Sequence, residues 1–150
     1  MRVCRTRVRK QAPWSRSSGS RTRTRRPIKR VIYVYRTSAN NPPQQILDKD
    51  RNARIITAGD FNEFTFVQPL TTYASLSGLK DLDAAAGVKD VERYTYLFDM
   101  SSQQLDHMFV SKAIADRKAK YEHVHINTWV DSAAMVSDHD PSVARLDVCA

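Results

Sequence analysis

The sequence predicts an α/β or α+β fold, in which strands are mixed with short helices. Residues 53–58 are a run rich in β-branched side chains, typical of a buried strand, and residues 104–111 read as a second strand. Apolar side chains at helical spacing mark residues 67–76. Such a mixture, without an internal repeat, favours layers packed around one core, for which 150 residues suffice.

Residues 1–40 are predicted to be an Arg-rich, disordered tail, distinct from a body at 41–150. Residues 1–47 hold thirteen Lys or Arg and no acid, whereas the other eleven bases and all sixteen acids leave residues 48–150 at −5. The tail has almost nothing to bury. Three interpretations stay open: a segment that binds nucleic acid or another polyanion, an organelle-targeting segment, or a tail without a function.

The first elements of the body follow from short apolar runs between polar breaks. Residues 31–35 are apolar enough for a short strand, and NNPP then interrupts the chain. Residues 44–50 are expected to be the end of a helix. The strand at 53–58 is expected to end at Gly59, directly before polar groups.

The middle of the body is predicted to contain one helix, one long loop and one strand. The helix covers residues 67–76 and stops at Gly78. Residues 79–103 are expected to be mostly loop. The strand at 104–111 has Leu105, His107 and Phe109 on one face, and Gln104, Asp106, Met108 and Val110 on the other.

The last elements are a short helix from Lys112 and two strands. Residues 122–130 alternate, with His123, His125 and Asn127 opposite Val124, Ile126 and Thr128, which predicts a strand. The polar loop SDHDP precedes a final strand at 142–149.

Several classes of protein receive no support from the sequence. Cys4 and Cys149 lie at opposite ends and form no disulfide framework, and no cysteine or histidine spacing indicates a zinc site. No apolar stretch approaches the roughly 18 residues of a membrane span. No apolar segment near Met1 indicates a secretory signal.

Three polar clusters each lie beside a predicted strand. They are Asp60-Phe61-Asn62, Leu105-Asp106-His107 and the run from Ser137 to Pro141. Each has an ordinary structural interpretation: an Asx turn or helix cap for the first, a hydrogen-bonded strand residue for the second and a polar loop for the third.

Taken together, these clusters resemble the endonuclease/exonuclease/phosphatase superfamily. The motifs are GDFN at 59–62, QLDHMFVS at 104–111 and SDHDP at 137–141, and the resemblance covers residues 46–148. It implies the C-terminal half of a four-layer α/β/β/α sandwich. It also implies a metal-dependent phosphoesterase that hydrolyses a phosphodiester or phosphomonoester with an activated water.

The resemblance implies a role for each matching residue. Asp60 and Asn62 would orient the attacking water and contact the phosphate. Asp138 would sit at a site for Mg²⁺ or Mn²⁺, whose preferred ligands are carboxylate oxygens. His139 would face the phosphate, and Asp106 would hydrogen-bond its imidazole.

Tyr96 is expected to contact the substrate, and Tyr94 and Thr95 are candidates for the same cleft. Phe61 is expected to point into the core, and His107 to be a packed residue.

The sequence contains no counterpart of the family's first sheet. The stretch before Asp48 contains no glutamate, so the family's metal-binding Glu is not found there either. The expectation is therefore a partial domain whose N-terminal half is missing. Two other functions stay open: a protein without enzymatic activity that binds nucleic acid through the Arg-rich tail, and an inactive remnant.

Three side chains near the end of the body have no role in the resemblance. His123 and His125 share a face of the predicted strand and could be a metal pair, but no third ligand is apparent, which favours a structural role. Trp129 is expected to lie in the core.

Overall fold

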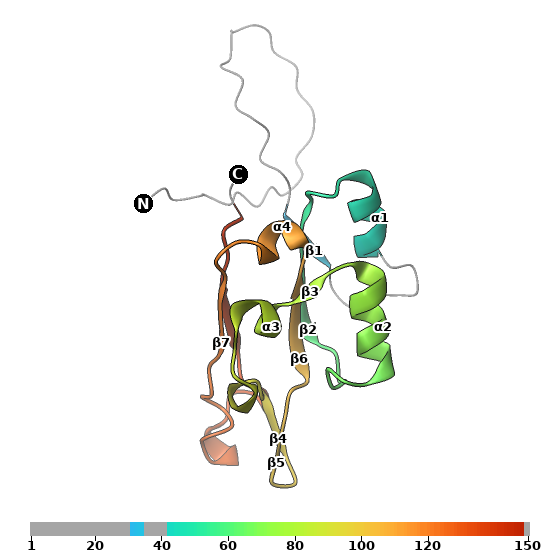
Figure 1. The fold of residues 1–150 in the computed structure, drawn as a ribbon. Coiled ribbons are helices and arrows are strands. Elements are labelled where there is room, and N and C mark those ends of the chain that lie inside the picture. Colours follow the sequence, from blue (N-terminus) through green and yellow to red (C-terminus); the bar gives the residue numbers. More distant parts are fainter. Residues whose placement is uncertain (1–30, 35–41, 149–150) are drawn as a thin grey trace, which may run out of the picture.

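A four-stranded sheet lies at the centre of the computed structural model, which describes residues 31–34 and 42–148 (Figure 1). Its order is β1–β2–β6–β3. The bounds are Val31–Val34 for β1, Arg54–Asp60 for β2, Lys80–Asp81 for β3 and Asp106–Val110 for β6. β1 is parallel to β2, and β6 is antiparallel to both of its neighbours. This mixture of strands and helices confirms the predicted α/β class.

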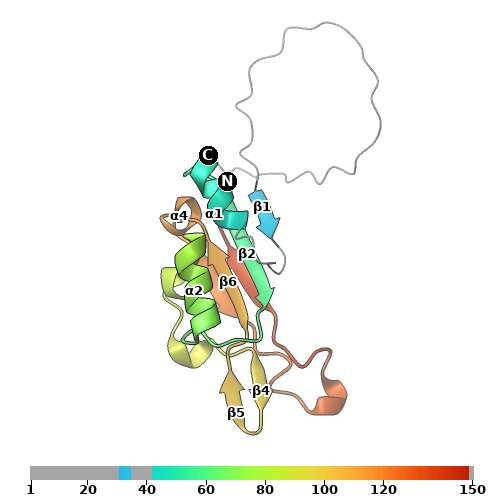
Figure 2. The same ribbon diagram turned by 90° about the vertical axis from the view of Figure 1, so that its right-hand side faces the viewer.

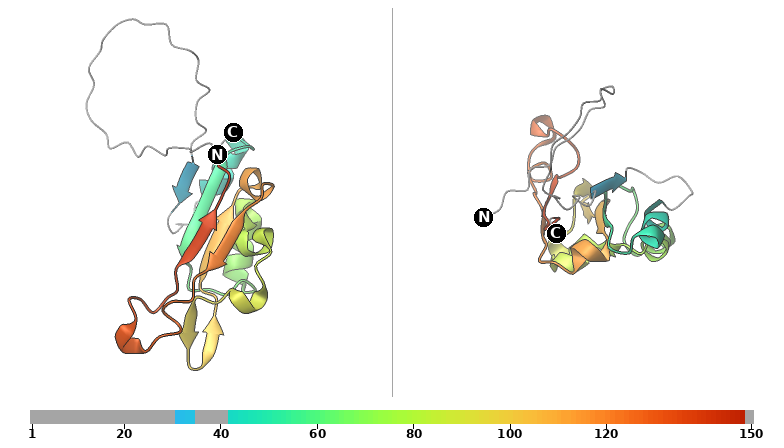
Figure 3. Two further views of the ribbon diagram at one scale, coloured as in Figure 1. Left: turned by 90° about the vertical axis from the view of Figure 1, so that its left-hand side faces the viewer. Right: turned by 90° about the horizontal axis from the view of Figure 1, so that it is seen from above.

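Two helices cover one face of the sheet, α1 (Pro42–Lys49) and α2 (Gln68–Ser77) (Figure 3). Ile55 of β2 and Phe109 of β6 point toward them and share a core cluster with Leu70 of α2. The apolar spacing that predicted a helix at 67–76 is thus the stripe that α2 packs on the sheet. Gly78 ends this helix in the left-handed conformation, as expected.

A pair of antiparallel strands, β7 (Lys120–His123) and β8 (Ser142–Arg145), packs on the opposite face. Ile56 and Val110 point to this side and meet Tyr121 of β7 and Ala144 of β8. Leu82 of α3 (Leu82–Ala86) and Ile114 of α4 (Lys112–Ala115) complete the cluster. In the described chain, a helix layer, the sheet and this strand pair therefore follow one another (Figure 3). A full four-layer sandwich stays a prediction.

The prediction of a mostly loop-like segment at 79–103 was wrong. This segment holds β3, α3, a 3₁₀ turn η1 (Asp90–Glu92), and the hairpin of β4 (Tyr96–Phe98) with β5 (Ser101–Gln103). The hairpin projects from one end of the molecule (Figures 1 and 2). These elements are two to five residues long, too short to produce a recognisable period.

β2 does not end at residue 58 as predicted but continues through Gly59 to Asp60. Gly59 has a φ of 148°, which residues with a side chain rarely adopt. The strand therefore passes through the glycine and carries Asp60 to the edge of the ladder.

The predicted strand at 122–130 was also wrong beyond its start, because β7 ends at His123. The backbone amide of Val124 bonds to Pro141 O, and the amides of Asn127 and Thr128 bond to the side chain of Asp140. These donors are used in a loop, so no neighbouring strand receives them. The last strand is likewise shorter than predicted and ends at Arg145.

Trp129 is not in the core as predicted. Its side chain lies in the β7–β8 loop and is 76% exposed. Its indole N–H donates to the hydroxyl of Tyr94 at 2.7 Å, which fixes the ring on the surface.

No helix in the described ranges is long and apolar enough to cross a membrane. Residues 1–30 and 35–40 of the predicted Arg-rich tail, with Cys4, fall outside the described residues, as does Cys149, whereas residues 31–34 form β1 where a short strand was predicted.

Candidate functional site

Two carboxylates lie opposite each other where β2 ends and the antiparallel β6 begins. In the antiparallel ladder Asp60 is the register partner of Asp106. Both lie in phase with Ala58 and Met108, on the face that turns toward the β7–β8 pair. Two like charges directly opposite each other destabilise a ladder unless a cation or a proton donor compensates them. The sequence of the two strands therefore places a concentrated negative charge at one edge of the sheet.

Asp60 also organises the turn that follows it. Its Oδ1 accepts a hydrogen bond from the backbone amide of Asn62 at 2.8 Å, and its Oδ2 accepts one from the Asn62 side-chain amide at 3.1 Å. Asn62 has a φ of 52°, a left-handed conformation that asparagine tolerates better than most residues. The Asx turn that the sequence allowed is thus present, and it holds Asp60 and Asn62 together at the surface.

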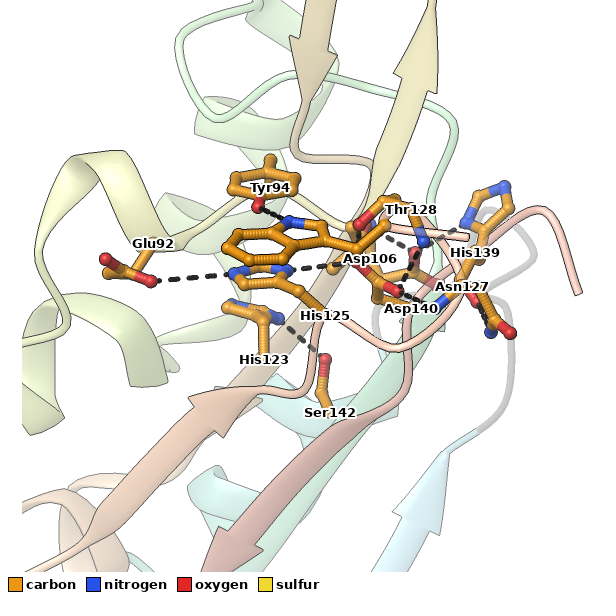
Figure 4. A network of polar contacts seen from close by, with 12 residues as sticks. Glu92, Tyr94, Asp106, His123, His125, Asn127, Thr128, His139, Asp140 and Ser142 are labelled. Atoms are coloured by element: carbon orange, nitrogen blue, oxygen red, sulfur yellow. Dashed lines mark hydrogen bonds and ion pairs between the residues drawn. The ribbon is translucent and has the colours of Figure 1, made fainter. Parts of the chain in front are cut away.

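His139 reaches the same place from the loop before β8. Its Nδ1 lies 2.6 Å from Asp106 Oδ2, so the contact expected between these two side chains is present (Figure 4). Both side chains are 22% exposed. The Nε2 atom has no hydrogen-bond partner among the described residues. An imidazole held in this way points its second nitrogen outward, where it can meet a ligand.

Thr95 fixes the carboxylate that holds the imidazole. Its hydroxyl donates to Asp106 Oδ2 at 2.7 Å, and the side chain is fully buried. The Asp106 Oδ1 atom makes no hydrogen bond within the described part of the chain. One oxygen of Asp106 is therefore committed to the protein, and the other remains available.

Tyr96, the predicted substrate contact, lies against His139. Their ring centroids are 4.9 Å apart, and the two residues form an isolated antiparallel bridge. The aromatic ring closes one side of the imidazole, and this leaves Nε2 as its accessible polar atom.

The electrostatics of the site favour a charged imidazole. Burial of the ring lowers the pKa of His139, but the hydrogen bond to Asp106 and the charges of Asp106, Asp60 and Asp138 outweigh it. The pKa of His139 is therefore raised above its ordinary value of 6.5. A cationic donor beside two or three carboxylates is suited to an anionic ligand that also brings or binds a metal ion.

A buried carboxylate, Asp140, anchors the loop that carries His139 (Figure 4). The backbone amides of Asn127 and Thr128 donate to its Oδ1 at 2.8 and 3.1 Å, and the hydroxyl of Thr128 donates to its Oδ2. His125 Nδ1 lies 3.0 Å from the same Oδ2. Asn127 in turn donates to the carbonyl of His139 at 2.6 Å. This network ties the β7–β8 loop to the residue that faces the site.

His123 and His125 have separate structural partners and do not form a metal pair. His123 is buried between Asp83, at 3.0 Å, and Ser142, at 2.7 Å. His125 stacks on Tyr94 with ring centroids 3.9 Å apart and an interplanar angle of 3°. The structural interpretation of these two histidines is supported.

The other packed residues are also where the sequence placed them. Phe61 packs against Tyr73 and Phe109, and His107 is buried with its Nε2 2.8 Å from Glu63 O.

One group of side chains in the described chain has the spacing of a metal site. Its members are Asp60, Asp106 and His139, whose ligand atoms lie within 4.8 Å of one another. Asp138, the predicted metal ligand, is exposed and is not in this group, although its charge acts on His139. The structure therefore brings four of the predicted site residues together, with Tyr96 beside them.

Sequence reasoning missed the residues that support the site. Asp140 was not assigned a role, and Asn127 and Thr128 were placed in a strand. The sequence does not reveal hydrogen bonds between residues a dozen positions apart, nor the burial of a single polar residue. Thr95 was expected to line the cleft, but its role as the hydrogen-bond partner of Asp106 was not foreseen.

Comparisons with known proteins agree with the arrangement of elements. Truncated TDP2 from Caenorhabditis elegans matches with a TM-score of 0.52 and 17% identity, covering 76% of this chain and 53% of that chain. A second structure of TDP2 from the same organism gives 0.51 and 17%, covering 76% and 40%. An endonuclease/exonuclease/phosphatase family protein from Leptotrichia buccalis gives 0.46 and 26%, covering 67% and 38%. No family model and no curated protein matches the chain.

The comparisons with the two TDP2 structures show a shared fold. The two TDP2 structures have the architecture of this chain, and the predicted resemblance is confirmed as a likeness of fold. The chain spans about half the length of the solved structures that it matches.

Proposed function

We propose that the described domain is part of a metal-dependent phosphoesterase of the endonuclease/exonuclease/phosphatase family, which hydrolyses a phosphodiester or phosphomonoester with an activated water. The observation that carries this proposal is the Asp106–His139 contact of 2.6 Å, with Asp60 opposite Asp106 in the ladder and His139 Nε2 turned outward. The fold shared with the TDP2 structures supports it.

His139 is proposed to bind the reacting phosphate. As an imidazolium it donates from Nε2 to a phosphate oxygen and stabilises the charge that develops there during hydrolysis. Asp106 holds the ring through Nδ1, and the hydroxyl of Thr95 fixes Asp106. Donor and orienting partners are thus in place before the substrate arrives.

The donor set at this edge fits a hard divalent cation. The exposed Asp60 and the second oxygen of Asp106 are carboxylate ligands of the kind that Mg²⁺ and Mn²⁺ prefer. The two negative charges face each other across the ladder, and this repulsion favours a bound cation. Because the pKa of His139 is raised, its imidazole is better suited to the phosphate than to the metal. A bound Mg²⁺ or Mn²⁺ supplies charge neutralisation at the phosphate and lowers the pKa of a bound water.

Three other residues take the roles that the motifs implied. Asp60 accepts the proton of the attacking water or orients it, and the Asn62 amide contacts the phosphate beside it. Asp138 adds negative charge near His139 and is proposed as a further metal ligand. Because the chain spans about half of the similar structures, a further segment is proposed to supply the rest of the cleft.

Hydrolysis of bis(p-nitrophenyl) phosphate by the purified chain tests the proposal. We expect slow turnover with Mg²⁺ or Mn²⁺ that is abolished by a chelator and restored by added metal. Asp60→Asn removes one of the two opposed carboxylates and is expected to lower kcat/KM by at least about tenfold.

Asp99→Asn is the matched control, because Asp99 is an exposed acid at the tip of the β4–β5 hairpin. Its turnover should equal that of the unchanged chain. Absence of metal-dependent turnover in a folded sample, or equal loss in both variants, would contradict the proposal.

A further inference from the structure

A cavity of about 270 Å³ is lined by residues that lie close in the chain to those of the candidate site, and none of the site residues lines it. Its walls come from three segments: the turn after Asn62, the residues around η1, and the second strand of the β4–β5 hairpin. The side chains that matter for its chemistry are Phe64, Phe66, Arg93, Tyr94, Gln103 and Gln104. Such a volume holds a small ring system and is too small for an extended chain.

The cavity and the candidate site are neighbours along the same backbone. Tyr94 precedes Tyr96 by two residues, and Gln104 precedes Asp106 by two. Backbone hydrogen bonds between neighbouring chain segments also link the cavity residues to the site. Thr95 N donates to Gln103 O and Phe61 N donates to Leu105 O, both at 2.9 Å. Residues two apart in extended chain lie about 6–7 Å apart on one face. This spacing brings the lining residues Tyr94 and Gln104 within reach of the next chemical group of a substrate held at Asp106 and His139.

An aromatic pair forms one wall of the cavity. Phe64 and Phe66 stack with centroids 5.4 Å apart and an interplanar angle of 2°. Phe66 is 78% exposed, so its outer face is free to receive a third ring. A large, flat and exposed apolar side chain beside a polar site is typical of a surface that binds a planar ligand.

The lining of the cavity also offers hydrogen-bonding groups. The side-chain amide of Gln103 makes no hydrogen bond within the described part of the chain, so its donor and acceptor are available. Gln104 is held by Asp83 at 2.7 Å, and Arg93 is held by Val88 O at 2.8 and 3.0 Å. The cavity thus combines Arg93 and Gln104, which are held in place by hydrogen bonds, with the aromatic face of Phe66 and the unbonded amide of Gln103.

We infer that this cavity binds the base of a nucleotide whose phosphate lies against His139; the inference rests on the proposed function. A base has a flat face for Phe66 and a polar edge for Gln103, whereas a sugar lacks the face and an alkyl chain lacks the edge. The substrate class is therefore a nucleotide or the end of a nucleic-acid strand.

Equilibrium binding of three small probes tests the inference by calorimetry on the full chain. Adenosine 5′-monophosphate has base and phosphate, ribose 5-phosphate has the phosphate alone, and adenosine has the base alone. We expect adenosine 5′-monophosphate to bind about five- to 150-fold more tightly than ribose 5-phosphate, the range that stacking of one base provides. Phe66→Ala should reduce this ratio toward one, whereas Val143→Ala, at an exposed apolar residue of β8, should leave it unchanged.

The outcomes separate the two proposals. Equal affinity for the two phosphates, or a ratio that Phe66→Ala does not change, overturns the base site. His139→Ala is expected to weaken both phosphates equally and to leave adenosine unaffected. If His139→Ala changes neither phosphate while the preference for the base persists, the base site stands and the proposed phosphate site is overturned.

Discussion

Replacing His139 by alanine is expected to lower kcat/KM for a phosphodiester by about 10²- to 10⁴-fold, the usual range for loss of one proton donor or charge-stabilising group. His139 Nε2 is the outward donor of the site, and its ring is held between Asp106 and Tyr96. Steady-state hydrolysis with Mg²⁺ or Mn²⁺ measures the change. Because His139 is partly exposed, the variant should keep the unfolding temperature of the unchanged chain to within a few degrees.

Asp106→Asn provides the matched test of how His139 acts. The pKa of His139 is raised, so the imidazolium and the activity that depends on it are present at low pH and are lost as the pH rises through that raised value, above 6.5. Loss of the Asp106 charge removes part of that support. The falling limb of the pH–rate profile should therefore move to lower pH. A profile that stays in place would show that the pair does not act as proposed.

The second large effect is on stability. Asp140→Ala is expected to reduce the free energy of unfolding by about 3–5 kcal/mol, because removal of one partner leaves several buried donors without an acceptor. The donors are the backbone amides of Asn127 and Thr128, the Thr128 hydroxyl and His125. Urea unfolding at pH 7 measures the loss. Asp131→Ala, at an exposed acid of the same loop, should change it by less than about 0.5 kcal/mol.

The pH dependence of this loss has a defined sign. Burial raises the pKa of Asp140, but the hydrogen bonds from Thr128, His125 and Asn127 outweigh it and lower the pKa below the ordinary 3.8. Stabilisation by the carboxylate is thus complete above about pH 4 and is lost as the pH falls through the lower folded value. The difference between the unchanged chain and Asp140→Ala should shrink below pH 4. A constant difference down to pH 2 would contradict this account.

The elements that the sequence predicted best are those with a strong apolar pattern. β2 and β6 are short buried strands, and α2 has an apolar stripe at helical spacing. The alternation in β6 placed His107 and Asp106 on opposite faces of the strand, and in the structure Phe109, on the face of His107, packs with the helices. Each of the three motifs lies beside a strand, and their convergence at one site is what the family resemblance implied.

The remaining features depend on long-range contacts that leave no pattern. Residues 124–130 alternate like a strand, but the buried carboxylate of Asp140 takes their amide donors, so a loop forms. Trp129 is apolar enough for a core, yet Tyr94 holds it at the surface. Thr95 supports Asp106 because the β4–β5 hairpin brings the chain before β4 beside the chain that leads into β6. In each case a contact with a residue distant in the sequence determines the local structure and overrides its intrinsic propensity.

Binding of Mn²⁺ to the purified chain tests most directly whether Asp60, Asp106 and His139 form a metal- and phosphate-handling site. Electron paramagnetic resonance of free Mn²⁺ gives the affinity without any need for turnover. We predict one ion per chain, whose affinity falls at least about tenfold in Asp60→Asn and in Asp106→Asn and is unchanged in Asp99→Asn. Absence of binding, or an affinity that none of these changes alters, would contradict the central claim.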